Sequence, residues 1–252
     1  MIIIKNRIEL DLMKKAGQLT GMTLEMIAKH IRPGISTQEL DALCEEFITR
    51  HGAKPSFKNY HGFTGSICAS VNEVVIHGIP SRKNILKEGD IISVDVGAYL
   101  NGFHGDAART FPVGEISEEA RKLIRVTEES FFKGIEHAYE GRRLGDISHA
   151  IQKHVEDNGF SVVRDFTGHG IGRSLHEDPQ IPNYGKEGRG PRLDKGMVLA
   201  IEPMVNVGRY NVRILDDNWT TVTEDGKLSA HYENTVAITD GEPEILTMMR
   251  GI

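Results

Sequence analysis

The stretch from Gly89 to Phe111, GDIISVDVGAYLNGFHGDAARTF, determines the fold that we expect for this chain. Two β-prone runs in it flank the dipeptide Asn101-Gly102. Asn-Gly is the strongest short-range hairpin signal, because both central residues of a type I′ turn need positive φ angles. The stretch therefore predicts an antiparallel hairpin with a two-residue turn.

The turn also fixes which residues face each other across the hairpin. Gly97 would pair with Asp106, so Asp95, two residues before Gly97, would lie diagonal to Asp106 on the same face. Two carboxylates at this separation repel each other. Either both lie on a solvated face, or one or two cations lie between them. Both interpretations stay open from the hairpin alone.

Composition excludes several classes of protein. The chain has 252 residues, long enough for a sizeable core, and a net charge of −6, which gives no basic footprint for nucleic acid. Its apolar runs are too short for a signal peptide or a membrane span. The two cysteines, Cys44 and Cys68, cannot form a disulfide framework. We therefore expect a cytoplasmic protein that binds neither nucleic acid nor membrane.

Apolar spacing and capping residues predict four helices around the hairpin and one further strand. The expected elements are a helix over Ile8–Ile31, a second helix from the capping box at Ser36–Glu39 to Gly52, a strand over Ser66–Ile76, a third helix capped by Ser117 and a fourth over Gly145–Asn158.

Several features recur at one fixed offset of 107 residues. The glycines that end the expected helices correspond, and so do the strands that follow, with Asp95 matched by Glu202. Asp106 has no such match, because position 213 is an arginine. We therefore predict a duplicated unit, packed about a pseudo-two-fold axis into one domain over residues 1–252, with Asp95 and Glu202 facing a central site. The matched pairs are Gly34 and Gly141, Leu40 and Ile147, Ile48 and Val155, Gly52 and Gly159, Gly89 and Gly196.

The second half supplies further candidate ligands. His169 lies among the glycines of TGHGIG, which permit close backbone approach. Alternation over SAHYENT places Ser229, His231, Glu233 and Thr235 on one face. His169 could simply lie in a surface turn, and the polar face could point to solvent or into a polar cleft.

One imidazole and four carboxylates would then converge. Without a metal, four acids would force several pKa values upward, so divalent cations are the economical explanation. Bridging carboxylates suit two ions about 3.5–4 Å apart that share an activated water. Manganese, iron, cobalt and zinc all fit this oxygen-rich set. The set is Asp95, Asp106, His169, Glu202 and Glu233.

These residues carry a resemblance to a known family. Asp95, the step to Asp106, GHGIG at 168–172, HEDP at 176–179, Glu202-Pro203 and Tyr232-Glu233 resemble the motifs of the type I methionine aminopeptidases in their short bacterial form. The similarity runs in order over nearly the whole chain. It implies the α/β pita-bread fold, in which a curved, pseudo-symmetric antiparallel sheet is backed by helices.

The resemblance also implies an activity and roles for particular residues. The reaction is hydrolytic removal of the initiator methionine from nascent chains with a small second residue. The five ligands would hold two divalent ions, and Glu202 would also move the proton of the attacking water. His77 resembles the histidine that hydrogen-bonds the scissile amide nitrogen, and His176 the one that stabilises the carbonyl oxygen.

The methionine pocket is implied in the same way. Tyr60, His61, Phe63, Cys68 and Trp219, together with the two histidines, would bind substrate, although each aromatic could equally be ordinary core. Leu175 and Phe57 depart from the residues usual in this family and affect the shape of the pocket. Backbone oxygens of Asn72, Val74 and Ser229 match a monovalent-cation site of relatives.

Two rival functions remain from the sequence. Prolidases and proline aminopeptidases share the fold and the metal set, but usually carry a further N-terminal domain. A binding protein of the same fold without activity would be expected to lose ligands, and here all five are present. We expect a monomer, whose docking to ribosomes, where it occurs, would use the surface of the catalytic domain itself.

Overall fold

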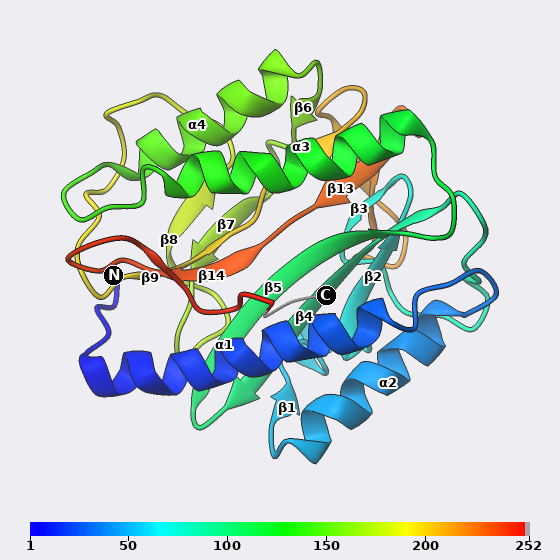
Figure 1. Ribbon diagram of the computed structural model, residues 1–252, viewed down its shortest axis with the longest axis horizontal. Helices are drawn as coiled ribbons and strands as arrows, with labels where there is room; N and C mark the ends of the chain where they lie inside the picture. Colours follow the sequence, from blue (N-terminus) through cyan, green and yellow to red (C-terminus); the bar gives the residue numbers. More distant parts are fainter. Residues whose placement is uncertain (250–252) are drawn as a thin grey trace.

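The computed structural model describes residues 1–249, and its first half contains two capped helices (Figure 1). Asn6 caps α1 (Arg7–Ala28) and Ser36 caps α2 (Thr37–Arg50), each in a capping box with the glutamate three residues on. The predicted box at Ser36 is confirmed. The strands of this half are β1 (Lys54–Pro55), β2 (Ile67–Val71), β3 (Val74–Ile76), β4 (Ile91–Leu100) and β5 (Phe103–Pro112), and η1 (Tyr60–Gly62) is a single 3-10 turn.

The strand predicted over Ser66–Ile76 is wrong as one element, because it is broken into β2 and β3. Asn72, between them, has a φ of +55°, which asparagine tolerates better than most residues. The Asn72 side chain holds the turn, since its Oδ1 accepts from the Ile91 amide at 3.0 Å and its Nδ2 donates to Asp90 Oδ1 at 2.8 Å. Alternation of residue types does not reveal such a break.

The second half repeats the order of two helices and several strands. Ser117 caps α3 (Glu118–Ile135) as predicted, by accepting from the Ala120 amide, and α4 (Leu144–Asp157) follows. The strands are β6 (Ser161–Val162), β7 (Thr167–Gly170), β8 (Glu177–Pro182), β9 (Val198–Ile201), β10 (Met204–Asn206), β11 (Val212–Ile214), β12 (Thr221–Thr223), β13 (Ser229–His231), β14 (Asn234–Ala237) and β15 (Glu244–Ile245).

The offset of 107 residues recurs in the geometry of the two halves. Helix α4 spans the range of α2 shifted by that offset, and Gly89 and Gly196 have φ angles of +90° and +89°. Lys54 pairs with Tyr99 across β1 and β4, and Ser161 pairs with Asn206 across β6 and β10. Ser161 and Asn206 thus lie 107 residues after Lys54 and Tyr99, respectively. The register itself is repeated, which local sequence similarity alone would not require.

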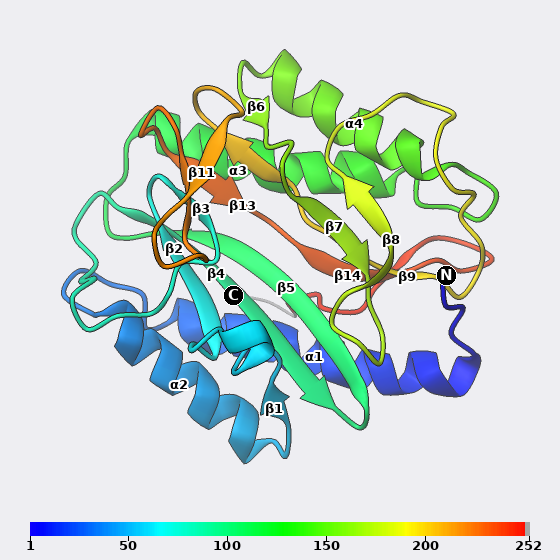
Figure 2. The ribbon, with the colours of Figure 1, turned by 180° about the vertical axis from the view of Figure 1, so that it is seen from behind.

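Antiparallel strands form the layer that the helices back. The sheets have the orders β1-β4-β2 with β5 on β4, β13-β10-β6, β11-β12-β3 and β15-β14-β9-β7-β8. Figures 1 and 2 show helices α1 to α4 together on one side of the strands. Helices α1 and α2 share a buried core with β2 and β4, whereas α3 and α4 share another with β9 and β10. This is the α/β architecture predicted for the pita-bread fold.

A third buried cluster lies between the two halves. It joins Met13 of α1 with Phe103 at the hairpin turn, and both with Val198 and Ala200 of β9. Phe57, Phe63 and Cys68 belong to the same cluster. The apolar side chains predicted around the methionine pocket therefore lie where the halves meet.

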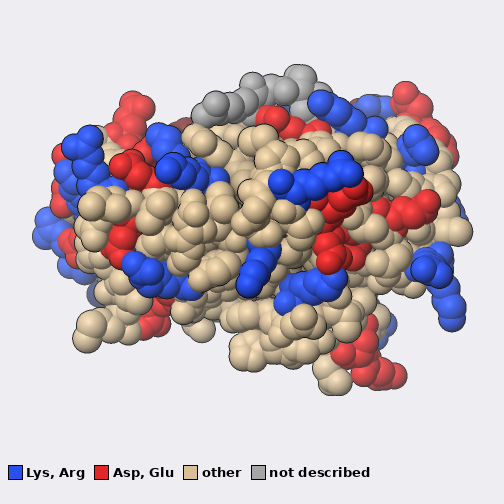
Figure 3. Space-filling view, turned by 90° about the horizontal axis from the view of Figure 1, so that it is seen from below, with Lys and Arg blue, Asp and Glu red and all other residues tan. Residues whose placement is uncertain are grey.

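The outer face that carries α1 and α2 shows Lys and Arg interspersed with Asp and Glu (Figure 3). Arg50 and Glu46, one turn apart on α2, form one such pair at 2.5 Å. Among residues 1–249, no helix is both long enough and apolar enough to cross a membrane.

Candidate active site

The β4–β5 hairpin places the two aspartates as predicted. Asn101 and Gly102 have φ angles of +54° and +86°, the positive values that a type I′ turn requires. Gly97 pairs with Asp106, which leaves Asp95 diagonal to it on the same face. Asp106 is buried, and Asp95 is half-buried with its Oδ1 fully buried, which decides against the solvated face.

His169 is held between two glycines that leave no room for a side chain. A Cβ on Gly168 would lie 2.4 Å from the Ala200 oxygen, and one on Gly170 would lie 2.1 Å from the Asp178 oxygen. The ring is oriented by its Nδ1, which donates to the Gly170 oxygen at 2.9 Å. Its Nε2 then faces Glu202 Oε1 at 3.6 Å and Asp106 Oδ2 at 3.9 Å. A hydrogen bond from one ring nitrogen, here Nδ1 to the Gly170 oxygen, is the usual way in which a histidine is oriented to bind metal through its other nitrogen.

Glu233 lies at the break between β13 and β14, against the centre of β5. Its amide donates to the Ala108 oxygen at 2.9 Å, and its own oxygen accepts from the Ala108 amide at 3.3 Å. Arg109 Nη1 also donates to the Glu233 oxygen at 2.5 Å. The polar face that begins at Ser229 and ends at Thr235 is buried throughout. It points into the protein rather than to solvent.

These side chains form what we call the acidic centre: Asp95, Asp106, His169, Glu202 and Glu233. Burial, reinforced by Glu202, raises the pKa of Asp95 to about 8. Burial and then neighbouring carboxylates, Asp95 and Asp106 respectively, also raise the pKa of Asp106 and Glu202 well above the ordinary range. The pKa of Glu233 is raised in the same way, chiefly by burial. Four acids packed together are thus unfavourable without positive charge.

The acidic centre fits divalent metal on its own geometry. Asp95 Oδ1, Asp106 Oδ1 and Glu233 Oε1 are buried oxygens that accept no hydrogen bond. Ligand atoms of Asp106, His169 and Glu233 lie within 4.8 Å of one another, the one such group of three found among residues 1–249. Burial lowers the pKa of His169 to about 3, which keeps its imidazole neutral, as a metal ligand must be.

A cavity of about 130 Å³ opens onto the acidic centre. Of the residues predicted to bind substrate, six line it, and the five members of the acidic centre lie beside them. His61 lies next to the lining residue Tyr60, with ring centroids 4.4 Å apart, and is not itself among the residues that line the cavity. Phe57 and Leu175 do line it. The six are Tyr60, Phe63, Cys68, His77, His176 and Trp219.

His77 and His176, the two histidines predicted to contact substrate, are held by different neighbours. His77 has a φ of +59°, and its ring meets Trp219 edge to face with centroids 5.9 Å apart. His176 lies over His169, with ring centroids 4.3 Å apart, and its Nδ1 is 2.6 Å from the Tyr60 hydroxyl. When the Tyr60 hydroxyl donates to Nδ1, the neutral His176 ring carries its proton on Nε2.

Two buried residues near the acidic centre were not predicted as part of it. His231 Nε2 lies 3.6 Å from Glu202 Oε2. It occupies the place of Asp106 in the second half, since Met204 pairs with His231 as Gly97 pairs with Asp106. Arg109 is the other. An arginine after two alanines inside a predicted strand is a signal that could have identified it, and Arg109 is indeed buried.

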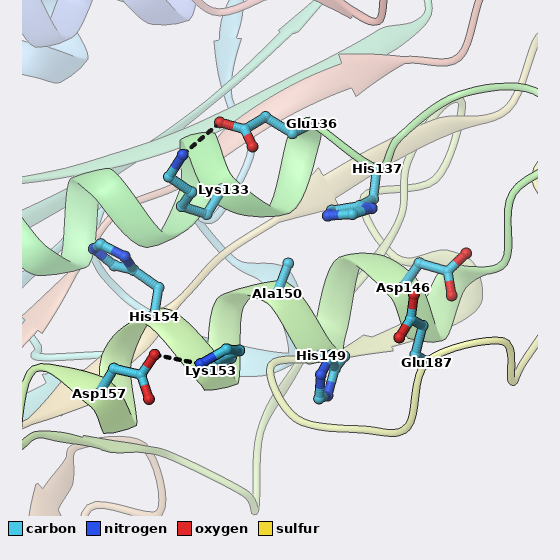
Figure 4. Close-up of a pocket in the computed structure, with 10 residues that line it drawn as sticks. All are labelled: Lys133, Glu136, His137, Asp146, His149, Ala150, Lys153, His154, Asp157 and Glu187. Atoms are coloured by element: carbon cyan, nitrogen blue, oxygen red, sulfur yellow. Dashed lines mark hydrogen bonds and ion pairs between the residues drawn. The ribbon is translucent and has the colours of Figure 1, made fainter.

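A larger, open hollow of about 500 Å³ lies elsewhere, between α3 and α4 (Figure 4). It is lined by charged side chains and three histidines, several of which pair locally. Lys133 contacts Glu136 at 2.8 Å, and Lys153 contacts Asp157 at 2.6 Å. These local pairs are typical of solvated helix faces, and the cavity at the acidic centre remains the candidate site.

Comparison with known proteins agrees with this site. Residues 11–240 match the profile of Metallopeptidase family M24. A match over most of the chain, with the acidic centre inside it, establishes the class. The chain therefore belongs to metallopeptidase family M24.

Relatives within that family narrow the assignment. The methionine aminopeptidase of Clostridium perfringens is 66% identical over 250 residues, which cover 99% of this chain and 100% of that protein. Methionine aminopeptidase 1 of Bacillus subtilis is 59% identical over 247 residues, covering 98% and 99%. The crystal structure of the Thermotoga maritima methionine aminopeptidase superposes with a TM-score of 0.97 at 50% identity, covering 98% and 100%.

The rival class is more distant. The prolidase of Pyrococcus furiosus shares the fold, with a TM-score of 0.81, but is 24% identical, and this chain spans 66% of its length. Within family M24 the chain is thus a member of the methionine aminopeptidase group, which confirms the resemblance stated from the motifs.

Proposed function

We propose that this chain hydrolyses the peptide bond after the N-terminal methionine of nascent polypeptides whose second residue is small. The main support is that one cavity of about 130 Å³ joins the acidic centre to Phe63 and Trp219. A thioether fits irregular apolar space and makes favourable contacts with aromatic rings. Chemistry and recognition of methionine thus meet in one place.

We propose that the acidic centre holds two divalent ions, with manganese, iron, cobalt and zinc as candidates. The unpartnered oxygens of Asp95, Asp106 and Glu233 support this, as does His169, whose Nδ1 donates to the Gly170 oxygen and whose Nε2 faces the carboxylates. When bound, such ions polarise the scissile carbonyl and make water acidic enough to attack near neutral pH.

Three side chains would then perform the proton transfer and stabilisation. Glu202 takes a proton from the attacking water and passes it to the leaving amine. His77 hydrogen-bonds the scissile amide nitrogen, and His176 donates from Nε2 to the carbonyl oxygen as charge develops there. Burial lowers the pKa of His77 to about 4 and lowers that of His176, so both act as neutral imidazoles.

Further proposals follow from the family. We propose that residues 1–252 form one catalytic domain, which works as a cytoplasmic monomer on nascent chains, and that any ribosome contact uses this domain's surface. We also propose a monovalent cation near the turn at Asn72, held by backbone oxygens of Asn72, Val74 and Ser229. In support of the cation site, the backbones of Asn72 and Ser229 lie side by side, since the Ser229 amide donates to the Asn72 oxygen at 2.9 Å.

The test is a panel of peptides with the metal-loaded protein. Met-Ala-Ser should be cleaved to free methionine, Met-Leu peptides at least roughly tenfold more slowly, and Ala-Pro peptides not at all. Preferential cleavage of Ala-Pro would favour the prolidase class. Metal binding without any cleavage would favour a binding protein of the same fold.

A further inference from the structure

The N-terminal segment before α1 is fixed against the second half of the chain. The Lys5 amide donates to the Gly196 oxygen at 2.8 Å, and a Cβ on Gly196 would lie 2.7 Å from the Lys5 oxygen. Figure 2 shows this segment, in dark blue, rising from α1 towards β9. Residues far apart in the sequence are thus held in contact beside the loop that joins β7 to β8.

Lys5 ends in a buried ion pair inside that loop. Its Nζ lies 2.5 Å from Glu177 Oε2 and also donates to the Ile3 oxygen at 3.1 Å. The two side chains are only 3% and 4% exposed. Every other pair of a Lys or Arg side chain with a carboxylate among residues 1–249 has both partners more than a fifth exposed.

The loop closes around the carboxylate of this pair. Glu177 Oε1 accepts from the Ser174 amide at 3.2 Å. Gly172 packs so tightly that a Cβ there would lie 2.5 Å from Glu177 Oε1 and 2.6 Å from Lys5 Cε. The loop therefore packs around the Glu177 carboxylate, and the positive charge of Lys5 offsets the free-energy cost of burying that carboxylate.

The residue next to Glu177 is His176, which faces the cavity. Its ring lies over His169 and is held on its other side by the Tyr60 hydroxyl. Removal of Lys5 would leave Glu177 buried and unpaired, so the loop would rearrange to hydrate it. Because Glu177 and His176 are consecutive, that rearrangement would move the imidazole. A displacement of about 1 Å at a reacting group can cost roughly a hundredfold in rate.

We propose that Lys5 is a positioning residue, which acts through Glu177 to hold the His176 imidazole over the acidic centre. Only the expected effect on the rate of hydrolysis rests on the proposed function. The geometric part, that Lys5 controls where the His176 ring lies, stands on the contacts of the ion pair.

The kinetic test uses the full-length, metal-loaded protein and the variant Lys5→Met. We expect kcat for Met-Ala-Ser to fall about tenfold or more, with KM and bound metal changed less than about twofold, because the loss arises at His176. Lys5→Arg should restore most of the activity. Lys14→Met, which removes an exposed pair with Glu244, is the matched control and should leave kcat unchanged.

A double-mutant cycle separates positioning from general damage. In a His176→Ala background, Lys5→Met should lower kcat no further, because its effect passes through that imidazole. An equal fall in both backgrounds would overturn the proposal. Lys5→Met combined with Glu177→Gln removes both charges and should recover activity relative to Lys5→Met alone, and it provides a folded variant if the single change unfolds the protein.

A spectroscopic readout keeps the proposal separate from the reaction. The NMR signals of the His176 ring should shift in Lys5→Met and stay in place in Lys14→Met, whether or not the protein cleaves Met-Ala-Ser. Unmoved His176 signals in Lys5→Met would overturn the proposal. An inactive parent protein in which these signals still move would contradict the proposed function and leave the positioning role supported.

Discussion

Glu202 differs from the other carboxylates of the acidic centre because an imidazole lies near each of its oxygens. His169 Nε2 is 3.6 Å from one oxygen and His231 Nε2 is 3.6 Å from the other. His169 carries its proton on Nδ1, so its Nε2 lone pair and the Glu202 carboxylate face each other across a space that suits a bound cation. The chemistry of Glu202 can be tested by a single substitution.

Replacement of Glu202 by glutamine keeps the shape of the side chain and removes its ability to accept a proton. We expect kcat for Met-Ala-Ser to fall by roughly 10²–10⁴-fold while KM changes little. Steady-state kinetics on protein with measured metal content tests this. Unchanged kcat in a metal-loaded Glu202→Gln protein would refute the role of Glu202 as the base.

Replacement of His176 by alanine should leave both metal ions bound, because His176 is not a member of the acidic centre. We expect kcat to fall by roughly 10²–10³-fold as a donor to the developing oxyanion is lost. Metal analysis and kinetics are measured together. His149→Ala, in the hollow between α3 and α4, is the control and should retain parent activity, whereas full activity in His176→Ala would exclude this role.

The raised pKa of Asp95 predicts how the metal-free protein responds to pH. Its folded pKa is about 8, against an ordinary value of 3.8, so the folded state keeps a proton that the unfolded state releases. The free energy of unfolding therefore falls as pH rises from about 4 to 8. The melting temperature of Asp95→Asn should exceed that of the parent by a margin that widens from pH 5 to pH 8, after chelation. Parallel curves would contradict the assignment.

At the scale of elements, the close approach of α1 to the hairpin determines where Asp106 lies. Gly105 precedes Asp106 on β5, and a Cβ there would lie 2.7 Å from the Gly17 amide nitrogen. Gly17 is equally tight on its other side, since its own Cβ would lie 2.5 Å from the Leu246 oxygen. Glycine at both positions lets helix, hairpin and C-terminal segment stack without a gap.

Gly105→Ala should therefore force α1 and β5 apart. We expect the free energy of unfolding to fall by about 1–3 kcal/mol, which corresponds to a melting temperature lower by several degrees. Denaturant unfolding measures the change. Gly241→Ala is the matched control, because its added Cβ would have its nearest neighbour at 3.9 Å and should cost little. Equal stability of the two variants would show that the contact is not limiting.

At the scale of the whole molecule, local signals in the sequence carried much of the fold. The Asn101-Gly102 turn and the caps at Ser36 and Ser117 followed from residue types and spacing. Alternation alone did not decide whether the polar face from Ser229 to Thr235 is buried. Features that depend on contacts between residues far apart in the sequence could not be predicted in this way. The break at Asn72 is held by Asp90 and Ile91, and the ion pair of Lys5 joins residues 172 positions apart. The position of the His61 ring against Tyr60 also depends on such contacts.

The central claim is that the acidic centre is a metal site at which methionine is released, and one measurement tests it most directly. The protein is stripped of metal with a chelator, and free methionine released from Met-Ala-Ser is then followed as Mn²⁺, Fe²⁺, Co²⁺ or Zn²⁺ is added back. We predict no release from the stripped protein, recovery with at least one of these ions, and no recovery in Asp106→Asn. Full release of methionine by the metal-free protein would contradict the account.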